Sequence, residues 1–177
     1  MNKPQWERIL HMYGRATDTP VYLAALLGSD KQSIKAALYH LNGAIVHQET
    51  VSPAAPFVTK ILINNLANND IADPTAYCGV IDWLQYLAES LQIVAISPEE
   101  AQIVADKELL AELASLSDDA AEEFLESEGL ELWEQLMPSG YINTAKLTPE
   151  VIETLTLLPE ASEALHAWKK VQVVHTN

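Results

Sequence analysis

A run of acidic side chains with helical spacing is the feature of this sequence best suited to chemistry. Four carboxylates recur at steps of three, one and three: Asp119, Glu122, Glu123 and Glu126. This spacing places them on one face of a helix. No lysine or arginine stands between Lys107 and Lys146, so no basic neighbour in the sequence neutralises them. Such carboxylates can bind a basic group, hold a cation or, in a suitable pocket, transfer a proton.

Two of these chemistries fit the pattern poorly. Calcium loops place their ligands around a central glycine, and the acidic run lacks that spacing. Acid and base catalysis needs a pocket that raises one carboxyl pKa, and a solvated helix face does not supply it. The chain also lacks the metalloprotease, hydrolase, phosphate-binding and paired-cysteine motifs. The sequence therefore predicts a protein that is not an enzyme and that uses no cofactor and no metal.

The remaining chemistry is recognition of a basic partner. The candidate binding residues are Asp118, Asp119, Glu122, Glu123, Glu126, Glu131, Glu134 and Trp133. Like charges four residues apart destabilise a helix by roughly 0.2 to 0.5 kcal/mol per pair, and a basic partner would relieve that repulsion. Two alternatives stay open. The carboxylates can be a solvated face, and Trp133, beside Leu132 and Leu136, has the spacing of a core residue.

The histidines are scattered along the chain. His11 stands seven residues before Asp18, and His47 follows the third expected helix. We expect both to satisfy backbone groups at helix ends, where peptide N–H and C=O groups lack helical partners.

Charge divides the chain into two halves. Residues 1–96 carry eight acids and six bases, whereas residues 97–177 carry 17 acids and four bases. Most of the net charge of −15 therefore lies in the second half. This balance disfavours direct binding to nucleic acid, which requires a basic surface.

Helix start signals organise the elements that position these residues. A short polar residue precedes proline five times: Thr19-Pro20, Ser52-Pro53, Asp73-Pro74, Ser97-Pro98 and Thr148-Pro149. The polar side chain can cap a helix, and proline tolerates its first position. Ser97 and Glu100 also have the spacing of a capping box. Each pair therefore predicts a helix start.

Apolar spacing between these signals is helical as well. Val80, Leu84, Leu87, Leu91 and Val94 follow one another by four, three, four and three residues. No alternation typical of strands persists. We predict an all-α fold of antiparallel helix hairpins stacked as a short α-solenoid, with an irregular helical bundle as the alternative. The expected helices are 5–12, 20–28, 31–46, 53–68, 74–94, 98–116, 118–136, 149–157 and 160–173, and we expect a break at Gly129 within the acidic segment.

The first 70 residues or so resemble bacterial HEAT-like repeat proteins. The resemblance is carried by Trp6, the run from Tyr13 to Pro20, Leu23, Leu26, Leu27, the run Ala36 to Leu38, Leu41, Ile45, the run His47 to Thr50, and the segment from Pro53 to Phe57. It implies stacked helix hairpins with a binding surface, and it names no ligand because this family mostly serves as scaffold. After Pro74 the motif does not recur.

Length and composition predict a single helical domain over residues 1–177, with a near-neutral repeat-like half at 1–96 and an acidic half at 97–177. Cys78 is the only cysteine, which fits a reducing compartment. The sequence has no secretory signal pattern and no run of 18 apolar residues. We therefore expect a cytoplasmic protein without contact to a membrane.

These observations favour a small acidic inhibitor of a basic protein. By type, the profile resembles immunity proteins that neutralise nuclease toxins, including those of contact-dependent growth inhibition. That resemblance implies that the acidic residues occupy the nucleic-acid-binding groove of the toxin. The alternative is a HEAT-like scaffold or adaptor that holds a peptide or protein subunit on an apolar face. A third reading is a chromophore lyase, since some HEAT-like repeat proteins act on tetrapyrroles, but no nucleophile or acid-base pair supports it.

Overall fold

The computed structural model describes residues 4–175 and is mostly helical. Helices contain 70% of the residues and strands 5%. The expectation of an all-α fold class is therefore confirmed. The α-helices are α1 (Thr19–Ala25), α2 (Lys31–His40), α3 (Ala55–Ala67), α4 (Pro74–Ile93), α5 (Lys107–Ser115), α6 (Asp118–Leu125), α7 (Leu130–Lys146), α8 (Thr148–Thr156) and α9 (Ser162–His175). Short helical turns are η1 (Trp6–Arg8), η2 (Ala16–Asp18), the π-helical η3 (Leu41–Ile45) and η4 (Glu100–Gln102). No helix within the described residues is long and apolar enough to cross a lipid bilayer.

Two short β-hairpins interrupt the helices, which the sequence did not predict. One pairs β1 (Leu10–His11) with β2 (Gly14–Arg15), and the other pairs β3 (Val46–His47) with β4 (Thr50–Val51), both antiparallel. Both connect their strands through two residues, and neither turn has the Asn-Gly or Asp-Gly pair that signals such hairpins. The expected helix 5–12 is therefore wrong, because η1 and β1 occupy it.

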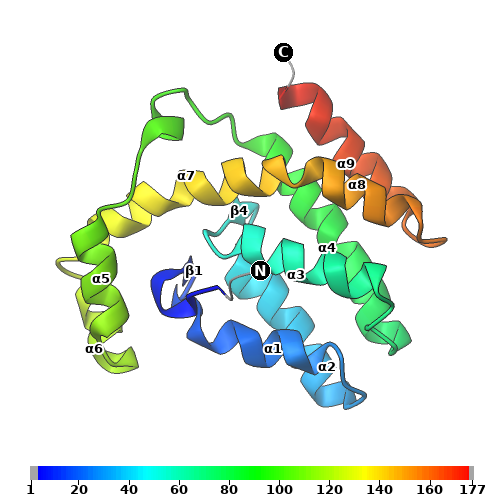
Figure 1. The fold of residues 1–177 in the computed structure, drawn as a ribbon, viewed down its shortest axis with the longest axis horizontal. Coiled ribbons are helices and arrows are strands. Elements are labelled where there is room, and N and C mark those ends of the chain that lie inside the picture. The colour runs from blue at the N-terminus through cyan, green and yellow to red at the C-terminus, as the bar shows by residue number, and fades with distance from the viewer. Residues whose placement is uncertain (1–3, 176–177) are drawn as a thin grey trace.

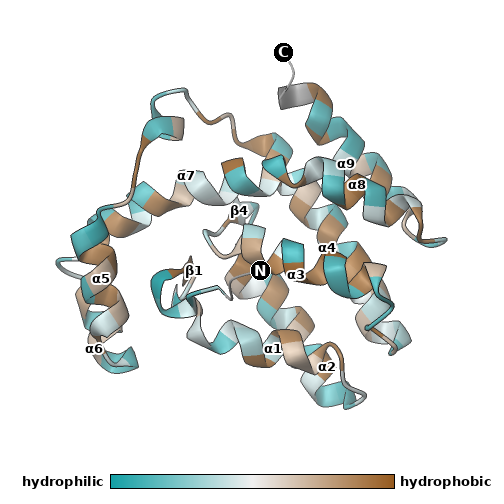
Figure 2. Cartoon of the chain, viewed as in Figure 1, coloured by the Kyte–Doolittle hydropathy of each residue, from teal (hydrophilic) through white to brown (hydrophobic). Residues whose placement is uncertain are grey.

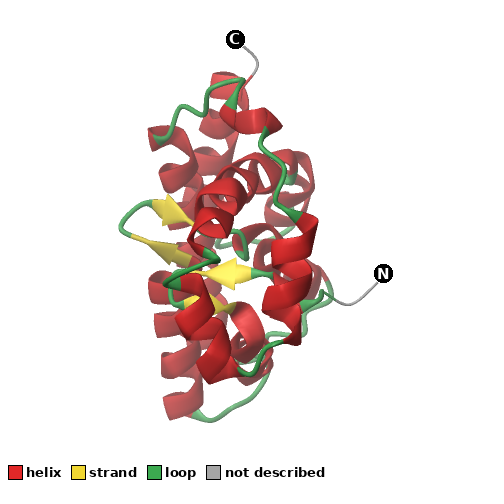
Figure 3. Cartoon of the chain, turned by 90° about the vertical axis from the view of Figure 1, so that its left-hand side faces the viewer, coloured by secondary structure: helices red, strands yellow, loops and turns green. Residues whose placement is uncertain are grey.

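Helix hairpins pack against one another along the chain. Helix α1 packs on α2, α2 packs on α4, α4 packs on α9, and α9 packs on α8. Helix α3 lies against α7, α8 and α4. Figure 1 shows α7 running across the molecule, from α5 and α6 at one side to α8 and α9 at the other. Figure 3, which shows the molecule from the side, has the two strand pairs (yellow) near each other.

Apolar side chains form two cores. The larger core joins residues from α1–α4 and α7–α9, with Trp83 and Trp168 among its largest buried side chains. A smaller one consists of Leu10, Leu113, Ala121, Phe124 and Leu132, from β1, α5, α6 and α7. Figure 2 shows hydrophobic and hydrophilic residues mixed along the helices, as amphipathic helices require. The acidic segment therefore packs on a core of its own, closed by a residue from the N-terminal hairpin.

The helix start signals are confirmed in part. Asp73 accepts hydrogen bonds from the Thr75 and Ala76 N–H groups and caps α4. Ser97 and Glu100 form the reciprocal bonds of a capping box, at 2.7 and 3.1 Å. This box opens only the short turn η4, however, and α5 begins at Lys107 under the cap of Asp106. The expected helix 98–116 is therefore wrong in its first half.

The acidic segment forms two helices, and the expected break at Gly129 is confirmed. The predicted helix 118–136 is broken between α6 and α7 at Gly129, whose missing Cβ leaves room for the ring of Phe124. An added Cβ there would lie 2.4 Å from that ring. Helix α7 in turn continues through Pro138 to Lys146, although proline removes one helical hydrogen bond.

Candidate functional site

The acidic surface comprises Asp118, Asp119, Glu122, Glu123, Glu126, Glu131 and Glu134, and all seven residues are exposed. Asp118 and Asp119 lie in the first turn of α6, where the helix dipole favours negative charge. Glu122 and Glu123 lie within α6, and Glu126 follows its last residue. Glu131 and Glu134 belong to the first turns of α7. The folded chain therefore exposes all seven carboxylates, on α6, on the residue after it and on the first turns of α7.

Arg15 contacts one end of the acidic surface, although 103 residues separate it from Asp118. One nitrogen of its guanidinium donates to Asp118, and the other donates to the carbonyl oxygens of Leu113 and Leu116, at 3.0 and 2.9 Å. Arg15 thus satisfies the carboxyl end of α5 while it pairs with the start of α6. Asp118 is the one member of the acidic surface with an ion pair inside the described part of the chain.

Trp133 is half-buried and packs against the smaller core. Its neighbours along the helix differ in burial, since Leu132 is fully buried and Glu134 is exposed. Part of the indole therefore remains accessible at the edge of the acidic surface. The same residue contributes both to the core and to the surface.

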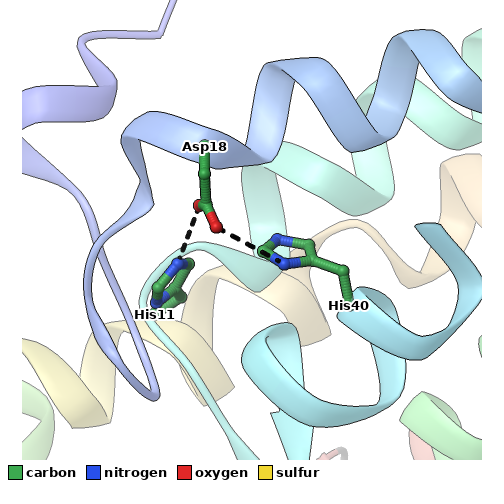
Figure 4. Close-up of side chains that lie close together, drawn as sticks. All are labelled: His11, Asp18 and His40. Carbon is green, nitrogen blue, oxygen red and sulfur yellow. Dashed lines mark hydrogen bonds and ion pairs between the residues drawn. The ribbon is translucent and has the colours of Figure 1, made fainter. Parts of the chain in front are cut away.

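A second polar cluster lies in the N-terminal half, where His11, Asp18 and His40 come together (Figure 4). Nε2 of His11 lies 2.9 Å from Oδ1 of Asp18, and Nδ1 of His40 lies 3.8 Å from Oδ2 of the same carboxylate. The hydroxyl of Thr19 lies 3.1 Å from Nε2 of His40. Both imidazoles are buried, whereas the Asp18 side chain is 51% exposed.

The hydrogen bonds of His11 define its protonation pattern. The Tyr13 backbone N–H donates to Nδ1 of His11 at 3.1 Å, so Nδ1 acts as an acceptor and the ring proton is on Nε2. A metal ion would have to bind at that Nε2, and ligating histidines ordinarily donate from their other nitrogen. The three ligand atoms lie within 4.8 Å of one another, yet this pattern of donors favours a hydrogen-bonded cluster over a metal site.

The order hydroxyl, imidazole and carboxylate also occurs in nucleophilic catalysis. Here Thr19 is fully buried, so a substrate carbonyl has no path to its oxygen. Burial lowers the pKa of His40 to about 4, against the opposing effect of Asp18 and with a smaller contribution from His11. His40 is therefore neutral at pH 7. The cluster joins β1, η2, α1 and α2 through polar contacts inside the fold.

The expectation that His11 satisfies a backbone group is confirmed by its bond from the Tyr13 N–H, but the sequence did not predict that its other nitrogen pairs with Asp18. The link to His40 carries no sequence signal, because it depends on how α2 packs on α1. Thr19 was expected to cap α1, and its hydroxyl instead contacts His40.

Two hollows accompany these features. One of about 530 Å³ lies beside the histidine cluster, and Tyr13, Asp18, Tyr22, Lys35, Tyr39 and His40 are among its lining residues. A larger one of about 870 Å³ lies between α4, α7 and α9, with lining residues that include Leu91, Ile96, Ile142 and Ala145. The comparisons of this chain with protein-family models, curated proteins and solved structures find no match.

Proposed function

We propose that this protein is an acidic inhibitor that binds a basic protein, and that its partner is a nuclease toxin domain. The observation that carries the proposal is the acidic surface, whose seven carboxylates are all exposed while only Asp118 is paired among the described residues. Such a surface has the charge complementary to a groove that binds phosphates. Occupying that groove blocks the nucleic acid and needs no catalysis by the inhibitor. In this proposal the protein acts as an immunity protein in the cytoplasm.

The helix arrangement supports a HEAT-like scaffold beneath this surface. The hairpins α1–α2, α3–α4 and α8–α9 contact each other through α2, α4 and α9 and through α3 and α8. We propose that these three hairpins form a short α-solenoid. Helices α5 and α6 and the start of α7 then form an insertion that carries the acidic surface.

A salt-dependent binding experiment tests the function. The full chain is used as bait at low and at high salt, the retained protein is identified and purified, and its dissociation constant is measured. We expect a basic nuclease whose association rate falls steeply as ionic strength rises, because the interaction is between exposed charges. Binding of a neutral partner with no salt dependence would contradict the proposal.

Charge reversal tests the surface itself. Replacing Glu122, Glu123 and Glu126 by lysine is expected to weaken binding by about 10- to 100-fold, mostly through the association rate. A matched control replaces Glu153, Glu160 and Glu163 by lysine. These residues are exposed and follow α7 in the sequence, and their replacement changes the net charge by the same amount. Equal losses in both variants would show that overall charge, and not the acidic surface, governs binding.

The larger hollow favours the adaptor as a second candidate function. Its lining is mostly apolar, and it lies between helices far apart in the sequence, which suits a peptide or a protein subunit. An adaptor of this kind would bind its partner almost independently of salt, so the same titration distinguishes the two functions.

A further inference from the structure

The smaller hollow is bordered by exposed aromatic side chains that the fold does not bury. Tyr13 is 66% exposed and Tyr39 is 77% exposed, and both line the hollow together with Tyr22 and Asp18. We call this site the tyrosine pocket. An added Cβ at Gly43 would lie 3.6 Å from the Tyr13 hydroxyl and 3.9 Å from the Tyr39 ring. The two rings are therefore neighbours across a residue without a side chain.

The inner wall of the tyrosine pocket is held in place by the histidine cluster. Tyr22 stacks on His40 with ring centroids 4.2 Å apart and an interplanar angle of 17°. Tyr13 makes edge contacts with His11 and with His47, at 6.2 Å each. These contacts fix the rings of Tyr13 and Tyr22 in advance, which reduces the ordering cost of binding a ligand.

Asp18 supplies negative charge at this site. One of its oxygens accepts a hydrogen bond from His11, and His40 next to it is neutral at pH 7. Its charge is therefore not cancelled by either imidazole, and half of the side chain faces solvent. Electron-rich ring faces beside a carboxylate are the combination that binds organic cations.

We propose that the tyrosine pocket binds a cationic side chain, an arginine guanidinium or a lysine ammonium, between Tyr13 and Tyr39 with Asp18 as its counter-charge. That this side chain belongs to the basic partner rests on the proposed function. The hairpin that carries Tyr13 also contacts the acidic helix, because β2 packs on α6 and a Cβ added at Gly14 would lie 3.9 Å from Leu125. A partner on the acidic surface is thus close to the hairpin whose turn carries Tyr13.

Lys35 lines the same pocket and makes the charge preference testable. Its ammonium has no ion-pair partner among the residues that the structure describes. For a cationic ligand, Lys35 is unfavourable and its removal strengthens binding. For an anionic ligand, its removal weakens binding, so the Lys35→Gln variant separates the two cases.

The test is an NMR titration of the full chain without any partner protein. The probes are N-acetyl-arginine methylamide, the lysine equivalent, and N-acetyl-citrulline methylamide as the uncharged analogue of arginine. We expect saturable shifts of the Tyr13 and Tyr39 ring signals with arginine or lysine, with a dissociation constant on the order of 10 mM. Citrulline is expected to give none. Saturation by citrulline equal to that by arginine, or no saturation by either cation, would overturn the proposal.

Variants at the exposed rim keep the fold intact. Tyr39→Leu is expected to weaken arginine binding about fivefold, whereas Tyr39→Phe retains the aromatic face and is expected to bind like the natural chain. Equal affinities for Tyr39→Leu and Tyr39→Phe would overturn the role of the ring. Weaker binding by Lys35→Gln would overturn the choice of a cation.

The titration also separates this inference from the proposed function. Charge reversal at Glu122, Glu123 and Glu126 should leave the probe affinity nearly unchanged, because the probe occupies the pocket alone. If the acidic surface proves dispensable for the partner while the probe still binds, the proposed function fails and the tyrosine pocket stands. If the probe does not bind while the charge-reversal variant no longer binds the partner, the tyrosine pocket proposal fails and the proposed function stands.

Discussion

His40 shows how a single buried residue links the fold to pH. Its side chain is only 6% exposed, stacks on Tyr22, and contacts Thr19 and Asp18. Burial penalises the charged ring more than the Asp18 carboxylate favours it, so the pKa falls from 6.5 to about 4. Between these values the unfolded chain binds the proton and the folded chain does not. The contribution of His40 to stability is therefore fully present above pH 6.5 and is lost as the pH falls toward 4.

The first prediction isolates this contribution by comparing the natural chain with His40→Phe. Between pH 7 and pH 5 the natural chain should lose about 2 kcal/mol of unfolding free energy that the variant does not lose. The comparison is needed because acidification also relieves repulsion among the carboxylates in both proteins. Urea titrations at each pH measure it, and identical pH profiles would contradict the assigned burial.

At the scale of elements, close approach between α7 and β4 depends on Gly140. An added Cβ at this residue would lie 2.5 Å from the Ser52 carbonyl oxygen and 2.8 Å from that of Val51. The next residue, Tyr141, accepts a hydrogen bond from the Val51 N–H at 3.1 Å. Backbone atoms cannot move away as a flexible side chain can, so the helix and the strand need glycine here.

Replacing Gly140 by alanine should therefore destabilise the protein by about 1 to 3 kcal/mol, despite the better helix propensity of alanine. Gly28→Ala is the matched control, because its added Cβ would meet only the Ala25 carbonyl at 3.4 Å. We expect that control to change the unfolding free energy by less than about 0.5 kcal/mol. Chemical denaturation measures both, and equal effects would show that α7 tolerates separation from β4.

The turn between β3 and β4 is an element under backbone strain. Gln48 and Glu49 have φ values of 47° and 69°, a left-handed conformation that favours glycine and asparagine in two-residue hairpins. The Glu49 N–H donates to the Tyr86 hydroxyl at 3.0 Å, which helps to hold this conformation.

Glu49→Gly should stabilise the protein by about 0.5 to 1 kcal/mol, since glycine adopts this conformation without strain and the hydrogen bond to Tyr86 uses only the backbone. Thermal unfolding provides the measurement. Glu89→Gly, inside the exposed face of α4, removes the same charge and should destabilise by about 1 kcal/mol. A loss of stability in Glu49→Gly would contradict the conclusion that the backbone is strained at this residue.

For the whole molecule, unbalanced charge opposes folding. The net charge is −15, and among the described residues only Asp118 of the acidic surface has an ion-pair partner. Self-repulsion of this kind is screened by salt. The acidic surface should therefore make the protein more stable as ionic strength increases.

Raising NaCl from about 10 mM to 500 mM should raise the melting temperature by a few degrees, corresponding to roughly 1 kcal/mol. The lysine variant at Glu122, Glu123 and Glu126 should show a smaller rise, because it lowers the density of negative charge on α6. Calorimetry at both salt concentrations tests this. A melting temperature that falls with salt would mean that ion pairs, and not repulsion, dominate the molecule.

The sequence by itself determined the features that depend on neighbours along the chain. The span of α4 follows from the Asp73 cap and from the stripe of Val80, Leu84, Leu87 and Leu91, all of which are buried. The exposed carboxylates of α6 follow from the same helical period. These features are local, because hydrogen bonds and faces of a helix repeat every few residues.

Only the tertiary structure decided which distant residues meet. In the folded chain Arg15 donates hydrogen bonds to the end of α5 and to Asp118. His40 lies against Thr19 and Asp18, and Tyr39 lies across Gly43 from Tyr13. Each of these contacts depends on how helices and hairpins pack, and side-chain hydroxyls and charges choose partners only after packing has brought them within reach. The acidic surface was therefore visible in the sequence, whereas the tyrosine pocket exists only in the folded chain.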